Sequence, residues 1–269
     1  MANIFKTIDH IRYFDDLARQ DSFIHRLHPL TKLLSTIIYA LVLVSFDKYA
    51  TLALLPLLFF PVLVAAAGRV PLSAILKRLL YLEPMIICLG LLNPLFDRET
   101  TVIMGHTVSS GWLIFASIVI KGSLAVSSAL LLMATTGMEG IALSLRMLRV
   151  PRIMVLQLLL TYRYLSTLLE EGGRIMQAYS FRSLSTVGVA AKAWGSLLGQ
   201  VLLRTIDRAQ RIYDAMCLRG FNGEYVPGKG RRAGIADPIY LLAWGAFFVL
   251  SRAFNLPLYL GCLLTGGVR

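Results

Sequence analysis

The sequence has few charged residues. Only 16% of its 269 residues are Asp, Glu, Lys or Arg, whereas about a quarter is usual for a soluble domain. Hydrophobic residues make up 57%, and the mean hydropathy is +0.68. One soluble core cannot absorb that many apolar side chains, so a large share of them must face lipid.

Cysteine and histidine are also scarce, which limits the chemistry that the chain can perform. Three cysteines lie far apart in the sequence: Cys88, Cys217 and Cys262. They form neither a disulfide framework nor a zinc spacing, so we interpret them as small apolar side chains. His25 and His28 have a spacing that could hold a metal on a helix, but Pro29 follows and no acid or thiol completes a ligand set. We therefore predict no metal site and no catalytic residue.

Apolar runs of membrane-spanning length dominate the sequence instead. They cover residues 33–46, 50–68, 79–96, 111–135 and 238–264. A helix needs roughly 20 apolar residues to cross the hydrocarbon core. The predicted fold class is an all-α integral membrane protein, with about five transmembrane helices plus long amphipathic cytoplasmic helices. Two charges fall inside the runs, Glu83 and Lys121. Their depths differ, so we expect each to face its own neighbouring helix or subunit.

The positive charge is concentrated in one segment. The chain carries a net charge of +12, and residues 136–235 hold fourteen bases against six acids. Since cytoplasmic loops of membrane proteins collect Lys and Arg, this segment and the N-terminus are predicted to be cytoplasmic, and nucleic acid is not expected as a partner. Lys77 and Arg78 fall in the next inner loop of this topology.

The predicted organisation has three parts. Residues 1–135 hold the N-terminal tail and the first four transmembrane helices. Residues 136–235 form the cytoplasmic coupling region, and residues 236–269 form a C-terminal transmembrane segment. The first apolar run begins only at about residue 33, so no cleavable signal peptide is expected.

Two cytoplasmic helices are predicted within the basic segment. Pro151 suits the first position of one helix. The second fits residues 188–219, where apolar side chains recur at steps of three and four apart from a gap at Thr205. These side chains are Trp194, Leu198, Val201, Ala209, Ile212 and Met216. An amphipathic helix of this length can lie on the membrane surface or across a partner protein.

A short internal repeat ends each of these helices. Aligned without gaps, residues 174–183 and 211–220 share Arg, Ile, Ala and a second Arg, and end in a small residue, with a period of 37. A cation is favoured at a helix C-terminus by the helix dipole, so two unrelated dipole-compensating arginines are one explanation. The other is that the chain makes the same contact twice, with a partner that comes in two similar copies. The candidate coupling residues are Ala178, Arg182, Ser183, Ala215, Arg219 and Gly220.

The sequence resembles the transmembrane T component of energy-coupling-factor transporters, in its CbiQ-type form. The resemblance runs from about residue 24 to 235 and is carried by residues 24–34, by Thr161-Tyr162-Arg163-Tyr164 with Glu170-Glu171, and by the repeat. The family pattern is Ala, three variable residues, Arg and Gly, present twice. The second copy matches fully, whereas Ser183 replaces the usual glycine of the first copy.

The resemblance implies a scaffold role without enzymatic activity. Each arginine motif would dock on one of two ABC ATPase subunits, which bind the ATP. The long helices would pass the ATPase motion to a separate substrate-binding membrane S component, which takes up cobalt (or nickel) for cobalamin synthesis or nickel enzymes. The chain itself would bind no cofactor and would lie in the bacterial inner membrane as a multi-pass protein.

Two other functions remain open at this stage. A pathway-forming ABC permease usually carries one coupling helix per chain, whereas this chain holds two motifs. A membrane-embedded enzyme needs a cluster of acid, His or Cys side chains at membrane depth, which Glu83 and Lys121 do not form.

Overall fold

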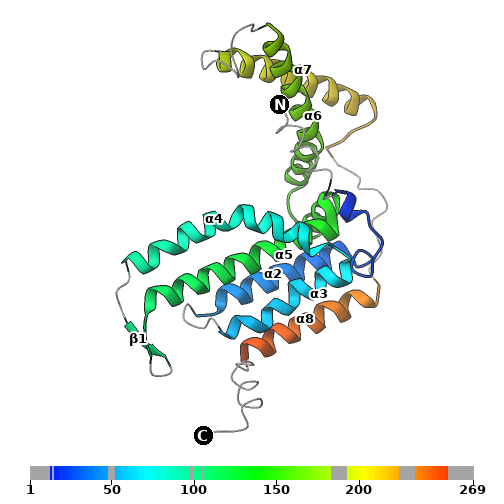
Figure 1. Cartoon of the computed structure of the whole chain (residues 1–269). Coiled ribbons are helices and arrows are strands. Elements are labelled where there is room, and N and C mark those ends of the chain that lie inside the picture. The colour runs from blue at the N-terminus through cyan, green and yellow to red at the C-terminus, as the bar shows by residue number, and fades with distance from the viewer. Residues whose placement is uncertain are drawn as a thin grey trace. The chain divides into compact units, whose positions relative to one another are not determined.

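The computed structural model confirms an all-α membrane protein, to which one short β-hairpin is added (Figure 1). It describes residues 13, 15–47, 52–96, 100–103, 106–182, 193–223 and 234–253. The chain forms two compact units. One unit joins Met1–Asp16 to Met138–Gly230, and the other joins Leu17–Gly137 to Arg231–Arg269. Each unit is described separately below.

The second unit contains the apolar helices. Its elements are α2 (Pro29–Ser45), the 3-10 helix η1 (Leu52–Leu58), α3 (Phe59–Gly68), α4 (Leu72–Phe96), α5 (Ser110–Met147) as far as Gly137, and α8 (Ala236–Ala253). The predicted spans 33–46, 79–96 and 111–135 therefore each fall on a helix, and the span 50–68 falls on η1 and α3. The span 238–264 falls on α8 as far as Ala253, and residues 254–264 lie outside the described residues. By length and composition alone, Gly111–Met147 is the one helix among the described residues that is long and apolar enough to cross a membrane, while Pro29–Ser45 and Leu54–Gly68 are shorter apolar helices.

Three sequence interpretations need correction in this unit. Lys77 and Arg78 were predicted in a loop but lie inside α4, which begins directly after Pro71. A charge near a helix end does not stop a helix, because a long basic side chain reaches back to the interface. The segment after α4 holds an antiparallel hairpin of β1 (Thr100–Ile103) and β2 (His106–Ser109), which was not predicted. Cys88 of this unit and Cys217 of the other are free and exposed, so neither fills a core.

An aromatic cluster packs α2, α3 and α8 together. The rings of Tyr39 and Phe60 stack with centroids 4.6 Å apart, and Phe248 lies 5.4 Å from Tyr39. Trp244 meets Phe60 edge-on at 4.8 Å. The Tyr39 hydroxyl donates to the Leu57 carbonyl at 3.2 Å, so its polar end is satisfied although the side chain is fully buried.

Helix α5 is broken at Gly137, where φ is +68° and ψ is 167°. This backbone conformation is essentially restricted to glycine. A Cβ at this position would also lie 3.1 Å from the Cβ of Ala18. A break leaves the preceding helical carbonyls without intrahelical partners. Here Lys32 donates its Nζ to the Thr135 carbonyl at 2.7 Å, and its side chain is only 5% exposed. The buried cation thus satisfies a helix C-terminus and complements its dipole.

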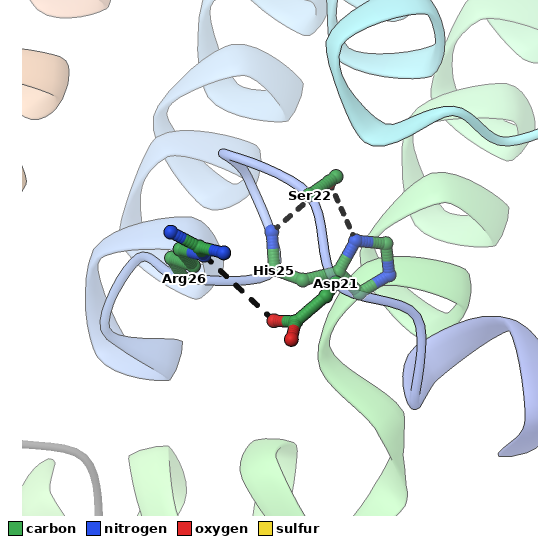
Figure 2. Close-up of polar contacts among 4 residues, drawn as sticks. All are labelled: Asp21, Ser22, His25 and Arg26. Carbon is green, nitrogen blue, oxygen red and sulfur yellow. Dashed lines mark hydrogen bonds and ion pairs between the residues drawn. The ribbon is translucent and has the colours of Figure 1, made fainter.

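The two histidines before α2 have structural roles. Figure 2 shows His25 against Ser22, whose hydroxyl lies 2.7 Å from His25 Nδ1, beside the Arg26–Asp21 ion pair. His28 is the N-cap of α2, because its Nδ1 accepts the Leu30 amide hydrogen.

Asp237, which is distant in the sequence, forms a hydrogen bond with the residue before α2. The His28 backbone N–H donates to Asp237 Oδ1 at 2.6 Å, and the other Asp237 oxygen accepts from the Gly234 amide at 2.7 Å. The Asp237 side chain is buried, and these hydrogen bonds give each of its oxygens a donor there. They tie the beginnings of α2 and α8 together.

The two intramembrane charges have separate partners, as predicted. Lys121 Nζ of α5 donates to the carbonyls of Phe46 and Asp47, which follow the end of α2. Glu83 of α4 accepts from the Ser123 hydroxyl at 3.0 Å. Each charge therefore links two neighbouring helices.

Replacing Lys32 by methionine should destabilise the second unit. The variant keeps the apolar stem but leaves the Thr135 carbonyl buried without this donor, at a cost of about 1–3 kcal/mol. Thermal unfolding of the detergent-purified chain should show a clearly lower midpoint for Lys32→Met. The exposed Lys77→Met serves as the control and should stay close to the parent. Equal midpoints for the two variants would contradict the role given to Lys32.

The stability should also depend on pH through His25. Burial lowers the pKa of His25 from 6.5, and the nearby Lys32 charge lowers it further. The unfolded chain therefore binds a proton at His25 more readily than the folded chain does. The contribution of neutral His25 to the free energy of unfolding is fully present above pH 6.5 and is lost as the pH falls below it. We expect the unfolding midpoint to drop between pH 7.5 and pH 5.5. His25→Gln should show a smaller drop, and an unchanged pH dependence would argue against this assignment.

Candidate functional site

The candidate coupling residues lie in the first unit, on two long helices. Helix α6 spans Arg152–Arg182 and begins directly after Pro151. Helix α7 spans Ala193–Leu218. The sequence predicts this helix from residue 188, but residues 183–192, including Ser183, lie outside the described residues. The pair Gly172-Gly173 does not end α6, and Gly173 is buried.

An ion pair joins the two helices. Glu171 Oε1 of α6 accepts from Arg204 Nη1 of α7 at 2.5 Å. The Glu171 side chain is 22% exposed and that of Arg204 is 60% exposed, so the carboxylate lies in the more protected position. Ile175 and Leu197, one from each helix, are buried. These contacts with α7 hold in place the part of α6 that leads to the first coupling motif.

The first motif occupies the last turn of α6. Ala178 and Arg182 are one helical turn apart and therefore share a face, and both are exposed. Arg182 is the last residue of the helix, where the dipole favours a cation. The small Ala178 side chain leaves room for another molecule to approach this face.

The second motif ends α7 with a left-handed glycine. Gly220 has φ +80°, its N–H donates to the Cys217 carbonyl, and the Phe221 N–H donates to the Met216 carbonyl. These two hydrogen bonds form a Schellman cap, in which glycine suits the left-handed position. Ala215 and Arg219 are exposed, one turn apart, at the end of the helix.

A cleft of about 440 Å³ lies between α6 and α7. Three arginines line it, Arg174, Arg182 and Arg204, together with the single acid Glu171. The remaining lining residues are Ile175, Ala178, Tyr179, Ala193, Ser196, Leu197 and Gln200. The cleft thus has a surplus of two positive charges, hydroxyl and amide groups, and an aliphatic wall. It is suited to an anionic group.

The opposite face of α7 is apolar and uncovered. Leu198, Leu202, Ile206 and Tyr213 are exposed at spacings of four or seven residues, so they share one side of the helix. Helix α7 meets α6 through its arginine-bearing side. Its apolar side, which the sequence predicts to bury against lipid or a partner, is left free within this unit.

The start of the chain contacts the first half of α6. The Tyr162 hydroxyl donates to Asp15 Oδ1 at 2.8 Å. Burial raises the pKa of Tyr162, and the hydrogen bond to the carboxylate raises it further. The tyrosine therefore stays protonated and keeps this contact at any physiological pH.

Sequence reasoning identified the two motifs but missed the cleft. Arg174 appeared only as the first residue of the repeat, and the Glu171–Arg204 pair was not predicted. One signal was available, because Glu171, Ile175, Ala178 and Arg182 recur at steps of three and four and so share one face of α6. The partner helix could not be chosen from that pattern alone.

Comparison with known proteins places the sequence among transporters. The sequence model of the CbiQ family, cobalt transport protein, matches residues 20–228. The energy-coupling factor transporter transmembrane protein EcfT of Bacillus subtilis is 28% identical over 226 residues, covering 78% of this chain and 83% of that protein. EcfT of Streptococcus thermophilus is 26% identical over 231 residues, covering 79% and 86%. The nickel permease LarQ of Lactiplantibacillus plantarum is 30% identical over 122 residues, covering 45% of each chain.

Substituting Gly220 should loosen the end of α7. Alanine would be held at φ +80°, at a cost of about 1–2 kcal/mol, so Gly220→Ala should speed amide hydrogen exchange in the last turn. Gly199 lies within the same helix, without a positive φ and with open space around it. Gly199→Ala should therefore slow exchange, because alanine is the better helix former by about 1 kcal/mol. Faster exchange in both variants would count against the cap.

Proposed function

Since the chain belongs to the CbiQ family of cobalt transport proteins, we propose that it is the transmembrane T component of an energy-coupling-factor transporter. In this role it is a scaffold that transmits the motion of separate ATPases to a substrate-binding membrane subunit, and it performs no catalysis itself. The EcfT relatives, aligned over more than three quarters of the chain, support this assignment.

The observation that carries the proposal is the pair of exposed arginines at two helix ends. Arg182 and Arg219 each follow an exposed alanine by one turn, at the C-termini of α6 and α7. A guanidinium at such an end offers several hydrogen-bond donors to an acidic groove. Two such ends on one chain suit a partner that is present in two similar copies.

The partners follow from this arrangement and from the family. Two ABC ATPase subunits bind the ATP, and each docks on one motif through Ala178, Arg182 and Ser183 or through Ala215, Arg219 and Gly220. A separate S component in the same membrane binds the cargo. The chain itself needs no cofactor.

We assign cobalt as the cargo, with nickel as the alternative. The family description names cobalt, whereas one relative is a nickel permease. His25 and His28 are not proposed as cargo ligands, because the described residues hold no group of three His, Cys, Asp or Glu side chains that could bind a metal ion. The S component would set the choice of cation.

The protein is a membrane component, and we place it in the bacterial inner membrane with its N-terminus in the cytoplasm. The surplus of Lys and Arg in residues 136–235 supports this orientation. Both arginine motifs then lie on the side where ATP is available.

Charge reversal at either motif should abolish transport. Arg182→Glu and Arg219→Glu each place an anion opposite the acidic groove of one ATPase, so cobalt uptake by cells should fall to background while membrane insertion is unchanged. Arg208→Glu makes the same charge change at an exposed position of α7 outside the motifs and should retain most of the uptake. Full uptake by both motif variants would refute the coupling role.

Purification in mild detergent offers an independent check. The tagged chain should bring along an ABC ATPase in about twofold excess, together with a small membrane protein. One ATPase per chain, with two copies of this chain, would favour a pathway-forming ABC permease instead.

A further inference from the structure

The two copies of the repeat have different surroundings, although their sequences align without gaps. In the first copy, Arg174 and Arg182 lie eight residues apart on α6 and both line the cleft closed by α7. In the second copy, Arg211 and Arg219 have the same spacing on α7. Like Arg174 and Arg182, both are exposed, but they project from the end of α7, where the neighbouring Leu218 side chain is 90% exposed.

The charges of the first copy are only partly compensated. Arg204 is paired with Glu171, the one acid among the described residues that line the cleft. Among the described residues, neither Arg174 nor Arg182 has an ion pair. Their Cα atoms are about 12 Å apart along the helix axis, and the wall between them includes Ile175 and Leu197. An acidic group that enters this space would meet two guanidinium groups on one wall of the cleft.

Because Arg174 and Arg182 line the same cleft, both can act on one bound acidic group. Exposed ion pairs contribute little, typically less than about 1 kcal/mol. A pair in a partly enclosed site is screened less and interacts more strongly. Arg211 is the counterpart of Arg174 but lacks a facing helix among the described residues.

We infer that Arg174 is a further partner-binding residue, and that the two ATPase contacts are unequal. The first contact is a cleft in which Arg174 and Arg182 together hold an acidic segment of one ATPase. The Glu171–Arg204 pair holds α7 in place as the opposite wall of this cleft. The second contact rests on Arg219 alone. This inference rests on the proposed function, since it requires the ATPases as partners.

The internal repeat supplies a matched experiment. Affinity of the full-length chain for purified ATPase is measured in detergent, first in an Arg219→Glu background that leaves the first contact. There, Arg174→Gln should weaken binding about tenfold, which corresponds to about 1.4 kcal/mol. In an Arg182→Glu background, which leaves the second contact, Arg211→Gln should weaken binding less than about threefold. Raising the salt concentration should weaken the first contact more steeply.

The outcomes separate this inference from the function on which it rests. No binding of ATPase to the unmodified chain would refute the coupling function itself. If the ATPase binds, but Arg174→Gln and Arg211→Gln have equal effects, the inequality is wrong. Arg163→Gln, at an exposed position on α6 outside the cleft, should leave binding unchanged. A tenfold loss there would mean that binding follows the overall charge of α6, which would also overturn the assignment to Arg174.

Discussion

The hydrogen bond from Lys32 to the Thr135 carbonyl is the constraint on which the apolar unit depends. Helix α5 must end its regular hydrogen bonding before Gly137, and the carbonyls left there need donors. A lysine that is almost fully buried supplies one of them. Because Lys32 belongs to the first turn of α2, and Asp237 holds the backbone of His28 just before it, the same few residues fix the break and the starts of α2 and α8.

A second helix end is held by the same kind of interaction. Lys121 of α5 donates to the carbonyls of Phe46 and Asp47 beyond the end of α2, and the guanidinium of Arg252 lies 5.0 Å from the centroid of the Phe46 ring. Lys32, at the start of α2, thus binds a carbonyl near the break in α5, and Lys121 of α5 binds carbonyls after the end of α2. A buried or partly buried cation therefore stabilises a helix C-terminus near each end of α2. Charge within the apolar runs is costly, and here each charged group has a partner that compensates for it.

The sequence was sufficient to predict where the helices lie, but it was insufficient to predict which residues of other helices contact them. Hydrophobic run length predicted the five apolar helices, but the third run was begun only after Arg78, so the prediction left out the first turns of α4 with Lys77 and Arg78. The break at Gly137 could not be predicted, because a glycine within an apolar helix is common and the donors that allow it are more than a hundred residues away. The Gly220 cap was predictable, since a local backbone conformation requires that residue.

The repeat illustrates the same division between local and tertiary information. A spacing of eight residues places the two arginines in the same helical arrangement in both copies, and sequence alone suggests two equal contacts. What differs is whether another helix faces the arginines. Helix α7 turns its basic side toward α6 and leaves Leu198, Leu202 and Ile206 exposed on the other side. One amphipathic helix thus completes the first cleft with one face, while its apolar face remains available for lipid or a partner protein. A duplicated motif gives duplicated chemistry only where the tertiary surroundings are also duplicated, and in this protein they are not.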